Sequence, residues 1–88
     1  MNWTCRFSKE AAKQLRRLPR DRKEQIAQVI SEMALNPAGG NARRIKSGKF
    51  QGALRRRVGD YRIIFSLDSV ERVVGVVAIL PRAEKTYR

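Results

Sequence analysis

The feature that most constrains the fold is a pair of strand-like runs, residues 53–58 and 61–67, separated only by Gly59 and Asp60. A two-residue loop that begins with glycine is typical of a type II′ turn, because its first central position needs a positive φ. The sequence therefore predicts a tight antiparallel hairpin. The length of the loop also sets the register of the two strands, with Val58 opposite Tyr61.

This register divides the hairpin into an apolar face and a basic face. Directly paired residues share a face and successive residues alternate, so the apolar side chains gather on one side. They are Leu54, Val58, Tyr61, Ile63, Phe65 and Leu67, with Arg56 among them. The other face carries Arg55, Arg57 and Arg62, with Arg57 opposite Arg62. Like charges in paired positions destabilise a sheet, so the pattern predicts a surface that binds an anion.

The overall charge points the same way. Twenty lysines and arginines against eight acidic residues give 20 − 8 = +12 in 88 residues. A chain of this length is expected to be one domain, residues 1–88. Nucleic acid is the commonest partner of so basic a domain, and an acidic protein would also relieve its repulsion.

Metal and disulfide chemistry are not expected. The sequence has no histidine and only Cys5, which suits a small apolar position on a strand rather than a disulfide or a zinc site. We expect no cofactor. No signal-peptide pattern and no apolar run near 18 residues is present, so the expected location is the cytoplasm, with no membrane span.

The rest of the chain predicts an α+β fold in the order β-α-α-β-β-β. Residues 2–7 alternate as a first strand, Ser8 suits a helix N-cap, and the helix it begins stops at Pro19. A second helix runs from about Asp21 to Asn36. The apolar run at residues 72–80 predicts a central strand. We expect a small antiparallel sheet with the two-helix hairpin packed on one face.

Residues 38–52 form a glycine-rich, basic connection without a clear period. Its cations, Arg43, Arg44, Lys46 and Lys49, immediately precede Arg55 and Arg57. A solvated loop is the simpler interpretation. The adjacency to the basic face of the hairpin favours RNA binding by these four residues together with Arg57.

The motif R-x-R-x-G-D-Y-R at residues 55–62, followed by a strand, Pro81-Arg82 and a C-terminal Tyr87, resembles the RelE/ParE superfamily of bacterial toxins. In the RelE branch this resemblance implies a small sheet with two helices on one face. The implied activity is ribosome-dependent cleavage of mRNA in the A site without metal. The implied partners are the ribosome, mRNA and an acidic antitoxin that silences the toxin.

The resemblance also implies roles for single residues. Arg62 matches an arginine that supports transition-state charge, and Arg82 matches one taken as the general acid. Arg55 falls where the family has a catalytic lysine, and Tyr87 matches an aromatic that stacks on the substrate base, although packing against the sheet is its alternative. Ala53 stands where RelE has a second lysine, so the general base stays open between Lys46 and Lys49.

Two other functions stay open at this point. A ParE-type inhibitor of DNA gyrase would share the fold without needing nuclease residues. A plain basic RNA-binding module would bind phosphates without cleavage, and its affinity would fall steeply with salt.

Overall fold

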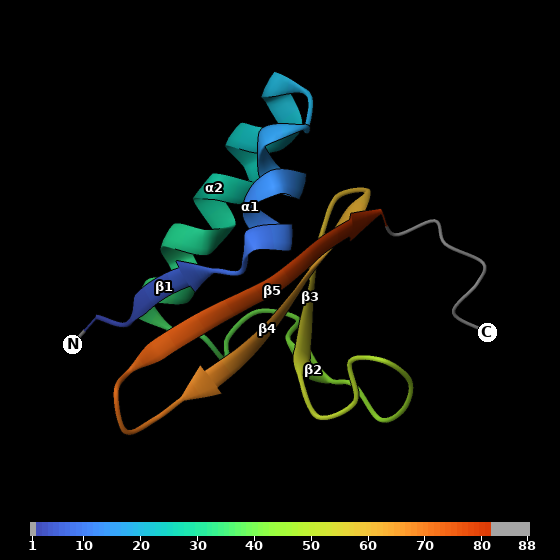
Figure 1. Ribbon diagram of the computed structural model, residues 1–88. Helices are drawn as coiled ribbons and strands as arrows, with labels where there is room; N and C mark the ends of the chain where they lie inside the picture. The colour runs from blue at the N-terminus through green and yellow to red at the C-terminus, as the bar shows by residue number, and fades with distance from the viewer. Residues whose placement is uncertain (1, 82–88) are drawn as a thin grey trace.

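The computed structural model describes residues 2–81. Five strands and two helices follow one another as β1 (Thr4–Phe7), α1 (Lys9–Arg16), α2 (Arg20–Leu35), β2 (Arg43–Arg44), β3 (Leu54–Val58), β4 (Tyr61–Asp68) and β5 (Val73–Pro81). The strands form one sheet in the order β1-β5-β4-β3-β2. Both helices lie on one side of this sheet, and the loop between β2 and β3 lies on the other (Figure 1).

The predicted α+β fold with a helical hairpin on one face is confirmed, with a refinement at each edge of the sheet. β1 pairs with β5 in parallel, so the sheet is mixed rather than wholly antiparallel. At the other edge, β2 pairs with β3 inside the segment expected to be loop. A strand of two residues has no periodicity to detect, and its pairing depends on β3 being in place.

The predicted hairpin is confirmed together with its register. β3 and β4 are antiparallel, Val58 pairs with Tyr61, and Arg57 pairs with Arg62. Gly59 has a φ of 57°, the positive value that the first turn position requires. The local turn chemistry therefore decides which side chains of β3 and β4 face the helices.

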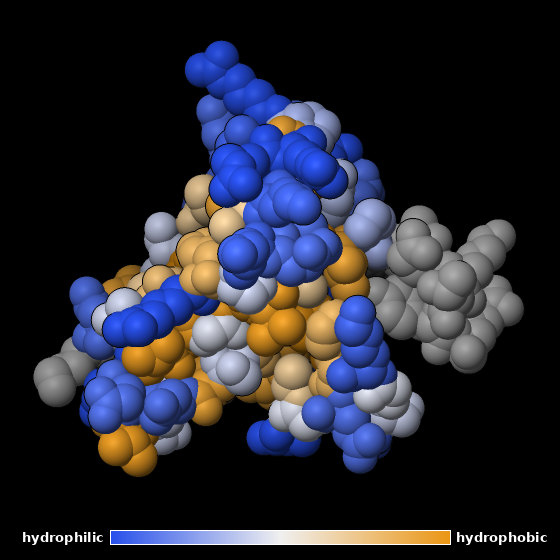
Figure 2. Space-filling view, viewed as in Figure 1, coloured by the Kyte–Doolittle hydropathy of each residue, from blue (hydrophilic) through white to orange (hydrophobic). Residues whose placement is uncertain are grey.

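The helices cover the apolar face of the sheet. α1 begins where Ser8 Oγ accepts a hydrogen bond from the Ala11 amide at 3.0 Å, as predicted for an N-cap. The largest fully buried side chains of this core are Phe65, Ile26, Met33, Ile63, Val74 and Val76. Figure 2 shows hydrophilic residues over the helices and hydrophobic residues gathered beneath them, along β5 in the middle of the molecule.

Cys5 fits the apolar role predicted for it. It is half-buried on β1, packs against the core, and its thiol donates to the Ile30 carbonyl with Sγ 3.8 Å from the oxygen. Burial raises the pKa of the Cys5 thiol. The thiol therefore stays protonated at neutral pH and behaves as a small apolar group.

The carboxyl end of β5 is held by α1 beyond the point where β1 stops. The Ser8 hydroxyl donates to the Val77 carbonyl at 2.7 Å, and Gln14 Oε1 accepts from the Ile79 amide at 2.6 Å. These side chains satisfy strand groups that β1 no longer reaches. The end of β5 is thereby fixed beside β4, where Leu80 pairs with Arg62.

Candidate nucleic-acid interface

Four arginines from three adjacent strands share the face of the sheet that the helices leave open. Arg57 pairs with Arg62 across β3 and β4, and Arg43 pairs with Arg55 across β2 and β3. Directly paired residues point to the same side, so the short β2 adds a fourth guanidinium to the three predicted from the hairpin. The basic face is therefore wider than β3 and β4 alone would make it.

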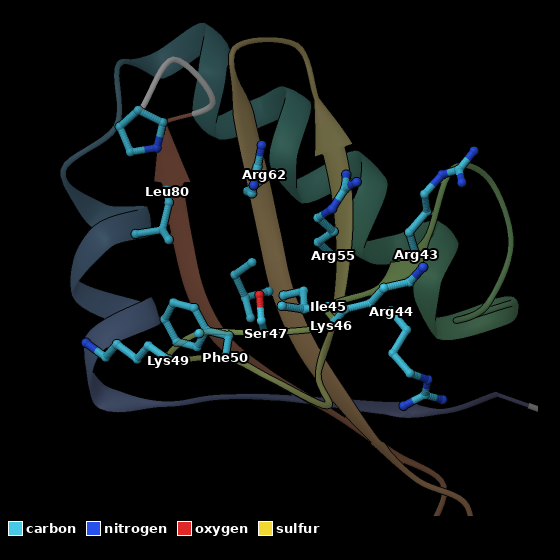
Figure 3. A pocket seen from close by; sticks show the side chains of 13 residues that line it. Arg43, Arg44, Ile45, Lys46, Ser47, Lys49, Phe50, Arg55, Arg62 and Leu80 are labelled. Carbon is cyan, nitrogen blue, oxygen red and sulfur yellow. The ribbon is translucent and has the colours of Figure 1, made fainter. Parts of the chain in front are cut away.

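A groove of about 1030 Å³ lies on this open face. It is lined by Arg43, Arg44, Ile45, Lys46, Ser47, Gly48, Lys49, Phe50, Arg55, Arg62, Ile64, Leu80 and Pro81. Arg55 and Arg62 project from neighbouring strands, and the loop that carries Ser47, Lys49 and Phe50 runs alongside them (Figure 3). A second hollow of about 390 Å³ adjoins the groove through Arg43 and Arg55 and adds Asn41 and Arg57. The open face thus offers cations around a concave surface large enough for a nucleotide.

Arg55 occupies the electrostatic centre of this arrangement. Partial burial lowers its pKa first, and repulsion from Arg62, Arg57 and Arg43 lowers it further. Arg55 remains a cation at neutral pH all the same. A bound anion would reduce the repulsion among the four arginines. This repulsion therefore favours anion binding at the open face.

Among the described residues, few carboxylates neutralise the arginines of the open face. Within residues 2–81, no acidic side chain forms a salt bridge with Arg43, Arg55 or Arg57. On the opposite face, where the parity of the hairpin placed Arg56, its guanidinium reaches Glu32 of α2 at 2.8 Å. The Nε atom of Arg62 is buried, and the residue as a whole is half-buried.

Most of the site residues predicted from the sequence are brought together by the fold. Those that line the groove are Arg43, Arg44, Lys46, Lys49, Arg55 and Arg62, while Arg57 lines the adjoining hollow. Arg82 and Tyr87 lie outside the described residues. The described chain ends at Pro81, which itself lines the groove.

Among the residues that were not predicted, Phe50 lines the groove and Asn41 lines the adjoining hollow. Phe50 and Asn41 both lie in the connection before β3, which has no periodicity to place them. The signal that could have identified Phe50 is its position next to Lys49 in a basic segment, since aromatics among cations are typical of single-stranded nucleic-acid sites. Asn41 gave no such signal; its Oδ1 accepts from the Arg57 amide at 3.0 Å.

Residues 2–81 contain no group of three or more histidine, cysteine, aspartate or glutamate side chains arranged to hold a metal ion. None of the helices in this range is both long and apolar enough to cross a membrane.

Comparison with known proteins adds a family and a fold. The family described as the ParE toxin of type II toxin–antitoxin systems matches residues 5–86. The archaeal RelE in the RelE–RelB complex from Pyrococcus horikoshii OT3 superposes with a TM-score of 0.81 at 21% identity, covering 96% of this chain and 99% of that chain. The isolated Escherichia coli RelE toxin gives a TM-score of 0.77 at 17% identity, covering 97% and 90%.

A third structure broadens the comparison beyond RelE. The YoeB/ParE toxin from Agrobacterium tumefaciens gives a TM-score of 0.74 at 14% identity, covering 89% of this chain and 96% of that chain. No curated protein sequence matches the chain. At these identities the structural matches establish the RelE-like fold, and the family match extends over nearly the whole chain.

Proposed function

Because the chain belongs to the ParE toxin family of type II toxin–antitoxin systems and has a RelE-like fold, we propose that it is a ribosome-dependent mRNA endonuclease. It cuts mRNA in the ribosomal A site and thereby inhibits translation. The observation that carries the proposal is the convergence of Arg43, Arg55, Arg57 and Arg62 on the helix-free face, around the groove and its adjoining hollow.

The proposed reaction uses the RNA's own 2′-hydroxyl as the nucleophile. Its oxygen forms a bond to the adjacent phosphorus, a pentavalent phosphorane carries the additional negative charge, and the bond to the 5′ oxygen of the next nucleotide breaks. The products are a 2′,3′-cyclic phosphate and a 5′-hydroxyl. Fixed guanidiniums stabilise the phosphorane by charge-assisted hydrogen bonds, so the arginine cluster supplies the main requirement of this step.

The proposed roles follow the resemblance to the RelE branch. Arg62 and Arg55 stabilise the transition-state charge, Arg82 protonates the leaving 5′ oxygen, and Tyr87 orients a base. Proton removal from the 2′-hydroxyl falls to Lys46 or Lys49, which both line the groove, because Ala53 offers no basic group. Arg43, Arg44 and Arg57 bind flanking phosphates.

Dependence on the ribosome is a physical expectation for such a site. Arginine is a poor base at neutral pH, and an unoriented RNA strand rarely aligns its 2′-hydroxyl with the leaving oxygen. Correct alignment of reacting groups can be worth about 7–11 kcal/mol. We propose that the ribosome supplies this alignment and the protein supplies the charges.

The proposed partners are the ribosome, mRNA and an acidic antitoxin, with the chain acting as one domain in the cytoplasm. The net charge of +12 supports an acidic protein partner. An antitoxin partner is also supported by solved structures with this fold, which include the RelE–RelB complex from Pyrococcus horikoshii and the toxin–antitoxin complex RelBE2 from Mycobacterium tuberculosis.

The second candidate function is ParE-type inhibition of DNA gyrase. Two observations favour it: the matching family is described as the ParE toxin, and Ala53 replaces the second lysine implied by the RelE resemblance. Under this alternative, the arginines of the open face would not be needed for toxicity.

The test is cleavage of a defined mRNA on purified ribosomes by the wild-type chain and by Arg62→Ala. We expect fragments ending in 2′,3′-cyclic phosphate, and a cleavage rate about 10²- to 10³-fold lower for Arg62→Ala, as when one preorganised donor is lost. Arg16→Ala on α1 is the matched control, since it removes the same charge from an exposed helix position. Intact mRNA together with inhibited gyrase supercoiling would replace the nuclease by the second candidate.

A further inference from the structure

Phe50 differs from every other aromatic side chain in residues 2–81. Phe65 belongs to the buried core, and Trp3, Phe7 and Tyr61 pack against that core beneath the helices. Phe50 instead lies half-buried on the opposite side of the sheet, where it lines the arginine groove. It is the one aromatic residue among the described groove-lining residues. The packing of the helix-covered core therefore does not account for its position.

The loop that carries Phe50 is held by its own backbone hydrogen bonds. The Ile45 amide donates to the Ala53 carbonyl at 2.8 Å, and the Gly52 amide donates back to the Ile45 carbonyl at 3.0 Å. The Phe50 carbonyl itself accepts from the Ala53 amide at 3.0 Å. The ring is thus placed by the loop beside the groove before any ligand binds, which lowers the entropic cost of using it for binding.

A cation already lies over the ring. Lys49 Nζ is 5.5 Å from the centroid of the Phe50 ring, in cation–π distance. The contact shows that a face of the ring is accessible to a polar group from outside the core. A flat ligand can displace this flexible ammonium, which then remains close enough to bind an attached phosphate.

We propose that Phe50 is the stacking surface for one nucleobase of a single-stranded RNA whose phosphates bind the open-face arginines. The choice of RNA as ligand rests on the proposed function. Aromatic rings in basic grooves bind bases in this way because every base offers a π-face, while the phosphates pair with cations. Phe50 holds the base and thereby positions the RNA strand against Arg55 and Arg62. It is a positioning residue and takes no part in the cleavage reaction itself.

The test compares two probes on the full chain by fluorescence anisotropy. One is a labelled 2′-O-methyl pentanucleotide RNA, which cannot be cleaved through a 2′-hydroxyl, and the other has the same backbone with abasic residues. The wild-type chain should bind the base-bearing probe about 5- to 100-fold more tightly, the range expected for stacking of one base. Phe50→Leu should remove this difference, because leucine keeps apolar volume without a π-face, and Phe50→Tyr should keep it.

Phe7→Leu is the matched control. Phe7 is another half-buried phenylalanine, but it packs on the helix-covered side, so its variant should retain the discrimination between the two probes. Equal binding of the two probes by the wild-type chain would overturn the proposal, and so would undiminished discrimination by Phe50→Leu. Equal binding by the wild-type chain overturns the proposal even when a variant does not fold, whereas a preference for the base-bearing probe is assigned to Phe50 rather than to Tyr87 by its loss in Phe50→Leu.

The binding test also separates this inference from the proposed function. Discrimination by the wild-type chain and its loss in Phe50→Leu would support base stacking even when no mRNA is cut on ribosomes. Cleavage by a chain that binds both probes equally would support the endonuclease and overturn the role of Phe50. Tighter binding of a single-stranded DNA of the same sequence would overturn the assignment of RNA as the ligand.

Discussion

Arginine side chains have opposite electrostatic surroundings on the two faces of the sheet. On the helix-covered face, Arg56 has a side chain only 13% exposed and pairs with Glu32 at 2.8 Å. On the open face, Arg55 lies close enough to Arg43, Arg57 and Arg62 for their charges to lower its pKa. Arg55 and Arg56 are thus neighbours on β3 with opposite surroundings. The charge of Arg56 is compensated by a carboxylate, whereas Arg55 is surrounded by cations.

This difference separates the residues that build the fold from those that act on a ligand. A charge that serves only the fold is expected to have a partner, because a partly buried and unpaired charge is costly. A cluster of like charges lowers stability and is retained where a ligand of opposite charge completes it. We infer that the helix-covered face provides the stability that the open face lacks.

The largest expected effect is on the helix-covered face. Phe65→Ala removes a fully buried ring from the centre of the core, and such truncations cost about 3–5 kcal/mol. In a domain of this size that is a large share of the total stability, about 5–15 kcal/mol. Urea denaturation followed by circular dichroism measures the loss. A cost below about 1 kcal/mol would mean that this face does not carry the stability of the fold.

The sequence predicted those features of the two faces that depend on residues close together along the chain. The turn at Gly59 and Asp60 is two residues long, which fixes the register of the hairpin. Given this register, the alternation of side chains along β3 places Arg55 and Arg57 on one face and Arg56 on the other. The N-cap at Ser8 and the end of the second helix at Asn36 are likewise local signals. These predictions are confirmed because neighbouring residues along the chain determine them.

The parts that could not be predicted depend on contacts between distant segments. The parallel pairing of β1 with β5 joins Thr4 to Val73, and no local pattern indicates which edge of the sheet β1 takes. The place of Phe50 in the groove likewise follows from the β2–β3 pairing and the loop it closes. The roles of Arg82 and Tyr87 stay predictions, since both lie outside the described residues.

A second, smaller effect compares adjacent arginines on β3. Arg56→Ala should destabilise the fold by about 1–2 kcal/mol, because it removes a charge-assisted hydrogen bond to Glu32 and the packing of a largely covered side chain. Arg57→Ala should leave stability within about 0.5 kcal/mol of the wild type, or raise it, since Arg57 is exposed and opposite Arg62. Urea midpoints of the two variants give the answer. Equal losses would show that the two faces do not differ in this way.

The smallest expected effect tests whether the open face is completed by an anion. Inorganic phosphate, compared with chloride at equal ionic strength, should stabilise the wild-type chain through binding to the native state alone. At ten times its dissociation constant this linkage gives about 1.4 kcal/mol, which for a domain of 60–100 residues corresponds to a rise in Tm of several degrees, about 4–8 °C per kcal/mol.

The double variant Arg55→Gln/Arg57→Gln should lose most of this rise, because it removes two of the four clustered guanidiniums. Its matched control is Lys13→Gln/Arg16→Gln, which removes the same charge from exposed positions of α1 and should keep the rise. Phosphate also stabilises proteins generally by exclusion from their surfaces, so the decisive quantity is the difference between the two double variants. An equal rise in both would mean that phosphate acts on the chain as a whole, and the open face would then not be the anion site.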